Sequence, residues 1–117
     1  LDTIEIPFTV PADMIAFKLI GTSMMPGYRP DAIVVVHREQ RRPLESFYGL
    51  EAAVRTSDGR RFIKTINRGS IPGTVNLISW NDLQPIENVR LEWIGEIFAV
   101  LPPSALRPIG SLASFRK

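Results

Sequence analysis

The sequence contains no cysteine, a single histidine and no long hydrophobic run. Without cysteine, neither a disulfide framework nor a thiolate metal site can form. The longest apolar runs fall far short of the roughly 20 residues that a membrane-spanning helix needs, and no secretory signal peptide is visible. The carboxylates show no metal-ligand spacing and no glycine-rich phosphate loop is present. We therefore expect a cytoplasmic protein that uses neither a metal nor a cofactor and does not enter a membrane.

What remains is an ordinary globular composition. The 117 residues are 44% hydrophobic and 22% charged, enough for one domain with a buried core. The net charge of +2 is mild, and no helix-turn-helix pattern is visible. Arginines form two small clusters, at positions 38–42 and at Arg60-Arg61. We interpret both clusters as solvated loop charge, with a contact to nucleic acid or to an acidic partner as the alternative.

Short strand-like segments separated by turn residues run through most of the chain. Asp58-Gly59 between two such segments predicts a hairpin. Gly95 interrupts the longest segment and predicts a bulge or a bend. No long amphipathic helix is evident, so the pattern predicts a compact, mainly β domain. The expected strands lie within residues 14–20, 32–37, 48–56, 60–67, 74–80 and 89–101.

The chain is organised around the segment from Gly21 to Asp31. A strand-like run leads into Gly21, and the chain bends through Pro26, Gly27 and Pro30 before the next strand. Ser23 stands at the first bend, where its hydroxyl would be held in a fixed position. A nucleophile benefits from such preorganisation, although most serines beside turns have no catalytic role.

A serine nucleophile needs a base, and Lys64 is the better candidate. Side chains alternate along a strand, so Phe62, Lys64 and Ile66 share one face and place an amine between two apolar groups. Burial disfavours the charged form of a lysine, and a neutral lysine can accept a proton from a serine hydroxyl. We considered a triad of His37 with Asp31 or Asp58 and rank it lower, because we expect His37 at the surface.

These segments together resemble the LexA-type serine peptidases, which include LexA, UmuD and the lambda-like phage repressors. The resemblance rests on Gly21-Thr22-Ser23-Met24-Met25-Pro26, on Asp31 before Ile33-Val34-Val35-Val36, and on the lysine strand, with closing segments that match in the family's order. The interval of 41 residues from Ser23 to Lys64 is close to that of the family. Signal peptidases, more distant relatives with a similar box, are disfavoured because they are membrane-anchored. The closing segments are Leu77-Ile78-Ser79-Trp80-Asn81, Gln84-Pro85-Ile86 and residues 93–100.

The resemblance implies a strongly bent sheet or partial barrel that serves as the C-terminal sensor and dimerisation domain of a transcriptional regulator. It implies Ser23 as nucleophile and Lys64 as base in self-cleavage of a linker to an upstream DNA-binding domain. It also implies a homodimer, induction by a RecA filament, and contact with DNA only through that upstream domain. We expect residues 1–13 to be an arm or linker remnant, residues 14–103 the peptidase domain and residues 104–117 a tail.

Two departures from the family leave alternatives open. Pro30 replaces the glycine that usually precedes the aspartate, and neither Ala-Gly nor Cys-Gly, the usual cleavage dipeptides, occurs in the sequence. The second hypothesis is therefore a dimerisation or ligand-binding module with an idle Ser-Lys pair, dimerising through the long strand at 89–101. A third, weaker hypothesis is a peptidase that acts on other proteins.

Overall fold

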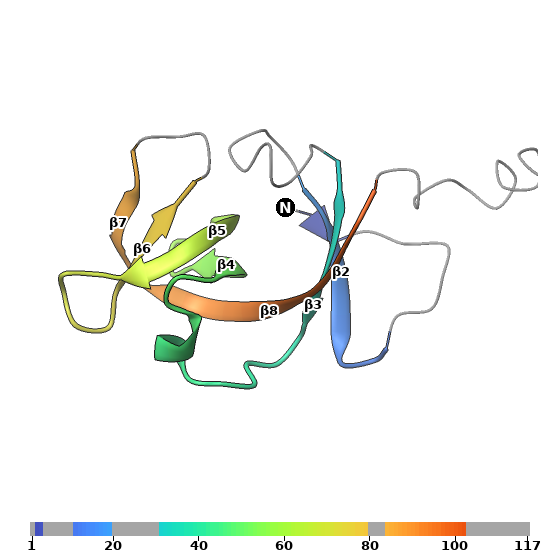
Figure 1. The fold of residues 1–117 in the computed structure, drawn as a ribbon, viewed down its shortest axis with the longest axis horizontal. Helices are drawn as coiled ribbons and strands as arrows, with labels where there is room; N and C mark the ends of the chain where they lie inside the picture. Colours follow the sequence, from blue (N-terminus) through green and yellow to red (C-terminus); the bar gives the residue numbers. More distant parts are fainter. Residues whose placement is uncertain (1, 4–10, 20–30, 80–83, 103–117) are drawn as a thin grey trace, which may run out of the picture.

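The fold is built almost entirely from β-strands, as the sequence predicts. In this computed structural model the described residues are 2–3, 11–19, 31–79 and 84–102. They form eight strands and one 3-10 helix, η1 (Figure 1). The elements in chain order are β1 (Asp2–Thr3), β2 (Met14–Lys18), β3 (Ile33–His37), η1 (Leu44–Phe47), β4 (Glu51–Thr56), β5 (Arg61–Arg68), β6 (Val75–Ile78), β7 (Ile86–Val89) and β8 (Leu91–Leu101). Among the described residues, no helix is long and apolar enough to cross a membrane.

The strands form one antiparallel sheet in the order β1-β2-β3-β8-β4-β5-β6-β7. The sheet bends strongly and is not closed into a barrel, which confirms the predicted fold class. β8 is its longest strand and curves through the middle of the molecule (Figure 1). Residues 91–96 of β8 pair with β4, and residues 97–101 pair with β3. One strand therefore joins a half made of β1 to β3 to a half made of β4 to β7.

Three apolar clusters stabilise this arrangement. The first lies within the β4–β7 half, where Phe47 of η1 is buried against strand residues such as Ile66 and Leu77. The second lies where the two halves meet and includes Phe17 of β2 and Ile63 of β5. The third covers the other face of β2 and β3. The clusters on both faces explain why β3 reads as a continuous apolar run and is buried throughout.

The predicted hairpin between β4 and β5 is confirmed. The two strands pair in regular antiparallel register, and the Gly59 amide donates to the Thr56 carbonyl oxygen at 2.9 Å. Gly59 has a φ of +87°, a conformation that glycine adopts without the strain that a Cβ would cause.

Three features differ from the sequence prediction. The strand expected at 89–101 begins at Leu91 as β8, and Val89 instead ends a separate short strand, β7, that the sequence did not predict. η1 occupies part of the expected loop after His37. Gly95, where a bulge or a bend was predicted, pairs regularly with Ala53, and the bulge-like register shifts of β8 lie on either side of it.

The topology also changes one expectation about association. We expected the long strand at 89–101 to offer a free edge to a second chain. In the sheet order β8 is an interior strand, and β1 and β7 are the edge strands of the described sheet. The predicted tail at 104–117 lies outside the described residues.

Candidate functional site

The predicted nucleophile lies on a segment whose two ends are fixed together. Ser23 itself, with residues 20–30, lies outside the described residues. Beyond the last pair of β2 and β3, the Leu19 amide donates to the Ala32 carbonyl oxygen and the Asp31 amide donates to the Leu19 carbonyl oxygen, both at 2.8 Å. The segment that carries Ser23 therefore leaves and re-enters the sheet at one hydrogen-bonded neck. Asp31 has a φ of 65°, the left-handed conformation in which a chain can reverse direction.

Lys64, the predicted base, is buried in the middle of β5. Its side chain belongs to a residue that is only 6% exposed, which is unusual for lysine. Antiparallel pairing sets Lys64 opposite Ala52 and sets Phe62 opposite Val54. The Lys64 Nζ lies 5.5 Å from the centre of the Phe62 ring. The predicted burial of this amine beside Phe62 is thus confirmed.

A hydroxyl that sequence reasoning did not select as a site residue contacts the lysine. Lys64 Nζ donates to Ser79 Oγ at 2.5 Å. Ser79 directly follows β6, and the pairs Ile66 to Leu77 and Thr65 to Ile78 continue by one step to Lys64 and Ser79. Residues directly opposite in an antiparallel pair project from the same face. Predicting this contact would have required the register of β5 against β6, which the sequence does not specify.

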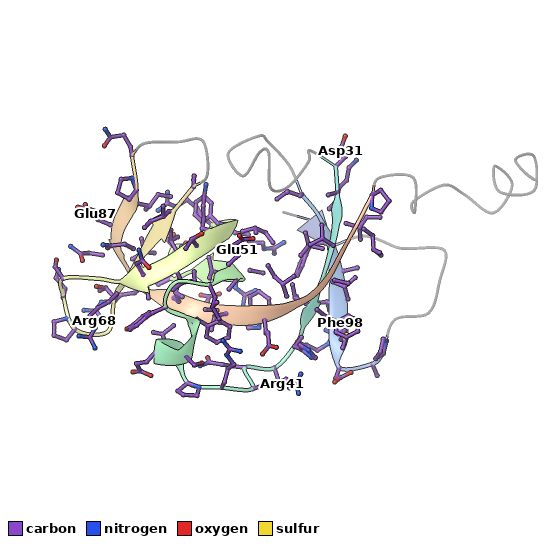
Figure 2. All side chains as sticks on the ribbon, in the orientation of Figure 1. Asp31, Arg41, Glu51, Arg68, Glu87 and Phe98 are labelled. Carbon is purple, nitrogen blue, oxygen red and sulfur yellow. The ribbon has the colours of Figure 1, made fainter. Side chains whose placement is uncertain are left out.

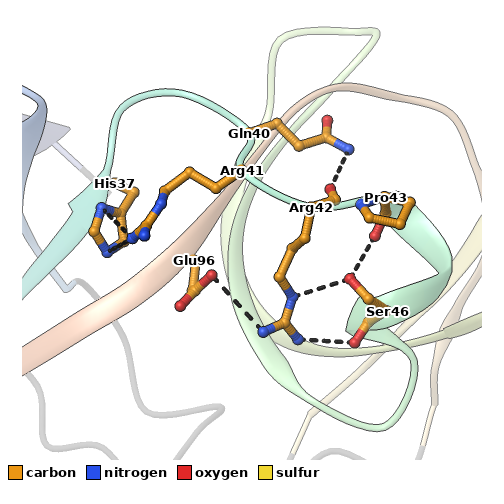
Figure 3. Close-up of polar contacts among 7 residues, drawn as sticks. All are labelled: His37, Gln40, Arg41, Arg42, Pro43, Ser46 and Glu96. Carbon is orange, nitrogen blue, oxygen red and sulfur yellow. Dashed lines mark hydrogen bonds and ion pairs between the residues drawn. The ribbon is translucent and has the colours of Figure 1, made fainter.

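His37 differs from the expectation for it. It is buried, with 7% of its surface exposed, and is not the surface residue that we expected. Arg41 Nη1 lies 2.8 Å from His37 Nε2 (Figure 3), and the Phe98 ring meets the imidazole edge-on with centres 5.9 Å apart. The His37 side chain is therefore enclosed by an arginine and an aromatic ring.

The two carboxylates considered as partners for His37 make other contacts. Asp31 pairs with Lys18 at 3.6 Å and precedes β3, whereas His37 ends it. Figure 2 accordingly shows Asp31 near the top of the view and Arg41, the partner of His37, near the bottom. Asp58 accepts a hydrogen bond from Thr56 and pairs with Arg60 at 3.0 Å. These placements argue against the histidine triad.

Metal chemistry has no apparent ligand set in the part of the chain that the structure describes. No group of three or more histidine, cysteine, aspartate or glutamate side chains converges there. The site as described is therefore a buried amine, a hydroxyl that accepts its hydrogen bond, and an anchored neck that leads to Ser23.

Comparison with models of protein families identifies the family of this chain. Residues 2–98 match the Peptidase S24-like family. The chain belongs to this family. It is the family of the LexA, UmuD and phage-repressor C-terminal domains, so the resemblance noted from the sequence is confirmed. Searches of curated proteins and of solved structures gave no match.

Membership of the Peptidase S24-like family indicates the type of fold in which the site lies. The family has a serine peptidase fold. Within that fold, β5 presents Lys64 from the interior of one half of the sheet, while the neck between Leu19 and Asp31 holds the segment that carries Ser23. A Ser-Lys peptidase requires a base and a nucleophile that are held in fixed positions.

Proposed function

We propose that this chain is the C-terminal sensor and dimerisation domain of a LexA- or phage-repressor-like transcriptional regulator. In this proposal it cuts the linker to an upstream DNA-binding domain with Ser23 and Lys64. The observation that carries the proposal is Lys64, buried in β5 within a chain of the Peptidase S24-like family. A lysine removed from water is the form of this side chain that can act as a base near neutral pH.

The reaction proceeds in two steps. Ser23 Oγ attacks the carbonyl carbon of the scissile peptide while its proton moves to Lys64 Nζ. The resulting ammonium then protonates the leaving amine, and the carbonyl remains attached to Ser23 as an ester. A water molecule attacks this ester, Lys64 accepts a proton from the water, and the Ser23 hydroxyl is restored by that proton.

Ser79 has a positioning role in this scheme. It accepts a hydrogen bond from Lys64 Nζ, so it limits the directions in which the amine can point. The butyl chain of a lysine otherwise has several rotatable bonds, and fixing its end reduces the entropy that is lost on reaching the transition state. Ser79 would therefore influence both the geometry and the proton affinity of Lys64.

Self-cleavage of the full-length protein at alkaline pH tests the proposal. We expect Ser23→Ala and Lys64→Ala each to abolish cleavage, measured as the appearance of two fragments over time. Lys18→Ala is the matched control, because Lys18 is a half-exposed lysine at the end of β2 whose ion pair with Asp31 is exposed to solvent. Cleavage at the wild-type rate in either dyad variant would contradict the assignment.

Ser79→Ala sharpens the test by separating a positioning role from a merely structural one. We expect a lower rate together with a shift of the midpoint of the pH–rate profile, because the hydroxyl contacts the amine that titrates. Ser79→Thr keeps the hydroxyl and should restore the wild-type midpoint. A lower rate with an unchanged midpoint would remove Ser79 from the mechanism.

A second candidate function is a non-cleaving dimerisation or ligand-binding module. Two large side chains of β8 favour it, because they are exposed, Phe98 at 60% and Val100 at 43%, and offer an apolar contact to a second copy. Sedimentation of the wild type and of Phe98→Ser over a concentration series tests this candidate. A wild-type protein that stays monomeric at high concentration would count against it.

A further inference from the structure

One arginine from each of the two sequence clusters lines a pocket that is separate from the lysine site. The pocket has a volume of about 320 Å³ and is bordered by Arg38, Arg55 and Arg61. Its apolar lining includes Phe17 and Trp93. Arg38 belongs to the first sequence cluster and Arg61 to the second, so the fold brings together cations that lie far apart in the chain.

Strand register places this pocket on the face opposite Lys64. Arg61 pairs with Arg55, and Arg55 pairs with Trp93, so these three residues form a row across β5, β4 and β8. Lys64 is three positions from Arg61 along β5 and therefore projects from the other face. A ligand in the pocket would not need to contact the proposed peptidase residues.

Trp93 is held firmly enough to serve as a binding surface. Its Nε1 donates to the Arg38 carbonyl oxygen at 2.8 Å, and its ring meets the edge of the Phe17 ring with centres 6.2 Å apart. A Cβ at Gly95 would lie 2.5 Å from the Trp93 ring, so the ring lies directly over this glycine. Such contacts order the side chain before any ligand arrives, which lowers the entropic cost of binding.

The cationic border is also arranged for carboxylates. Arg55 and Arg61 are direct cross-strand neighbours, an unfavourable placement for like charges that a shared anion would relieve. Within the chain, Glu92 pairs with Arg55 at 2.5 Å. The register of β8 against β4 shifts at this point, between Trp93 and Leu91, so Glu92 is the extra residue of a bulge. A ligand carboxylate would compete with Glu92 for the same guanidinium.

We propose that this pocket binds an acidic peptide segment of a partner protein, with one aromatic or large aliphatic side chain seated against Trp93. The volume is at the lower end of the range for ligand pockets and suits a single side chain. Arginine forks recognise flanking carboxylates. A nucleic acid is disfavoured, since it would need a basic stripe, while Arg41 and Arg42 are engaged with His37, Ser46 and Glu96 (Figure 3).

The test uses a fluorescein-labelled peptide, acetyl-Asp-Glu-Phe-Glu-Asp-amide, and the full chain at low ionic strength. We expect saturable binding in fluorescence anisotropy that weakens as sodium chloride rises from about 50 to about 300 mM. In a Trp80→Phe background, Trp93 is the remaining tryptophan, and its emission should change with the same midpoint. The amide analogue of the peptide, with Asn and Gln in place of Asp and Glu, should not bind.

Three variants locate the site. Arg61→Ala should raise the dissociation constant about tenfold or more, since a charge-assisted contact is lost. Glu92→Gln should lower it severalfold, because Arg55 loses its internal competitor. Arg68→Ala is the matched control, because it removes the same charge from the other end of β5, where Arg68 lies over the Tyr48 ring, and it should have little effect.

Several outcomes would overturn the proposal. One is the absence of saturable peptide binding, and another is an equal loss from Arg68→Ala, which would indicate attraction to net charge alone. Tighter binding of an oligo-dT strand with the same variant pattern would assign the pocket to nucleic acid instead. Because none of these measurements involves Ser23 or Lys64, failure of this proposal is distinct from failure of the proposed peptidase function.

Discussion

The two faces of β5 use the same kind of charge in opposite ways. On one face Lys64 is 6% exposed and contacts a ring and a hydroxyl. On the other face Arg61 is exposed and borders an open pocket. A buried amine can lose its proton, whereas a guanidinium keeps its charge in any protein environment. One strand therefore carries a buried amine on one side and an exposed, permanent positive charge on the other.

The two faces of β5 also differ in how far water can reach them. The lysine face continues into the cluster around Phe47, which is closed to water. The arginine face is lined by Trp93 and Phe17 but remains accessible. Isolation from water is thus a property of packing on each face rather than of the cation. Substitutions on each face should separate the contribution of packing from that of the cation.

Phe47→Ala should cause the largest loss of stability. Phe47 is 1% exposed and closes the cluster on the lysine face, so its removal leaves a cavity that costs about 3–5 kcal/mol. Phe98→Ala is the matched control, because Phe98 is 60% exposed and should change stability by less than about 1 kcal/mol. Denaturant unfolding of both variants gives the comparison. Similar losses from the two would mean that Phe47 does not seal the lysine face.

Gly95→Ala should be the largest perturbation on the arginine face. The added methyl group would lie 2.5 Å from the Trp93 ring and 3.0 Å from the His37 carbonyl oxygen. Displacement of a packed ring costs about 1–3 kcal/mol. We expect a shift of Trp93 fluorescence in a Trp80→Phe background together with a lower unfolding midpoint. Trp93→Leu combined with Gly95→Ala should recover part of the loss, and strict additivity would refute the contact.

Lys64→Met and Arg61→Met compare the two cations directly. Replacing a buried amine by an apolar side chain of similar length should stabilise the protein by about 1 kcal/mol, because a desolvation cost is removed. The same change at exposed Arg61 should stay within about 0.5 kcal/mol of wild type. Thermal unfolding at neutral pH measures both. A destabilised Lys64→Met protein would show that the amine stabilises the fold more than its burial costs.

The smallest effect is expected at the turn that joins β4 to β5. A hydrogen bond from Thr56, and then the nearby Arg60, hold the pKa of Asp58 below its ordinary value of 3.8. A lowered folded-state pKa means that this contribution is complete above pH 3.8 and is lost as the pH falls through the folded-state value. The difference in stability between wild type and Asp58→Asn should therefore narrow below that pH. Glu87→Gln serves as the control, and a difference independent of pH would be contrary to this account.

Much of the fold could be predicted because its signals are local. The apolar run that became β3, the Asp58-Gly59 turn and the alternation around Lys64 each depend on residues within one segment. β7 was missed because it is only four residues long and contains Asn88 at a φ of 54°. A strand this short, with a left-handed residue inside it, leaves almost no periodic signal.

The site was predicted less completely because its contacts are made across strands. The burial of Lys64 followed from alternation, but its partner Ser79 depends on the register of β5 against β6. The contact of His37 with Phe98 joins it to a strand far along the chain. The meeting of Arg38 with Arg61 likewise follows from the bend of the whole sheet. Residue type and spacing carry no information about these encounters.

The place of β8 has a consequence for how the chain matures during synthesis. This strand is the last in the sequence, yet it lies between β3 and β4 in the sheet and pairs with both. As the polypeptide emerges from the ribosome, the two halves of the sheet cannot be joined by strand pairing until residue 101 is outside the exit tunnel. Contacts between segments so distant form slowly. The nascent protein would then remain incompletely folded until nearly all of this domain had been translated, which would delay the proposed self-cleavage.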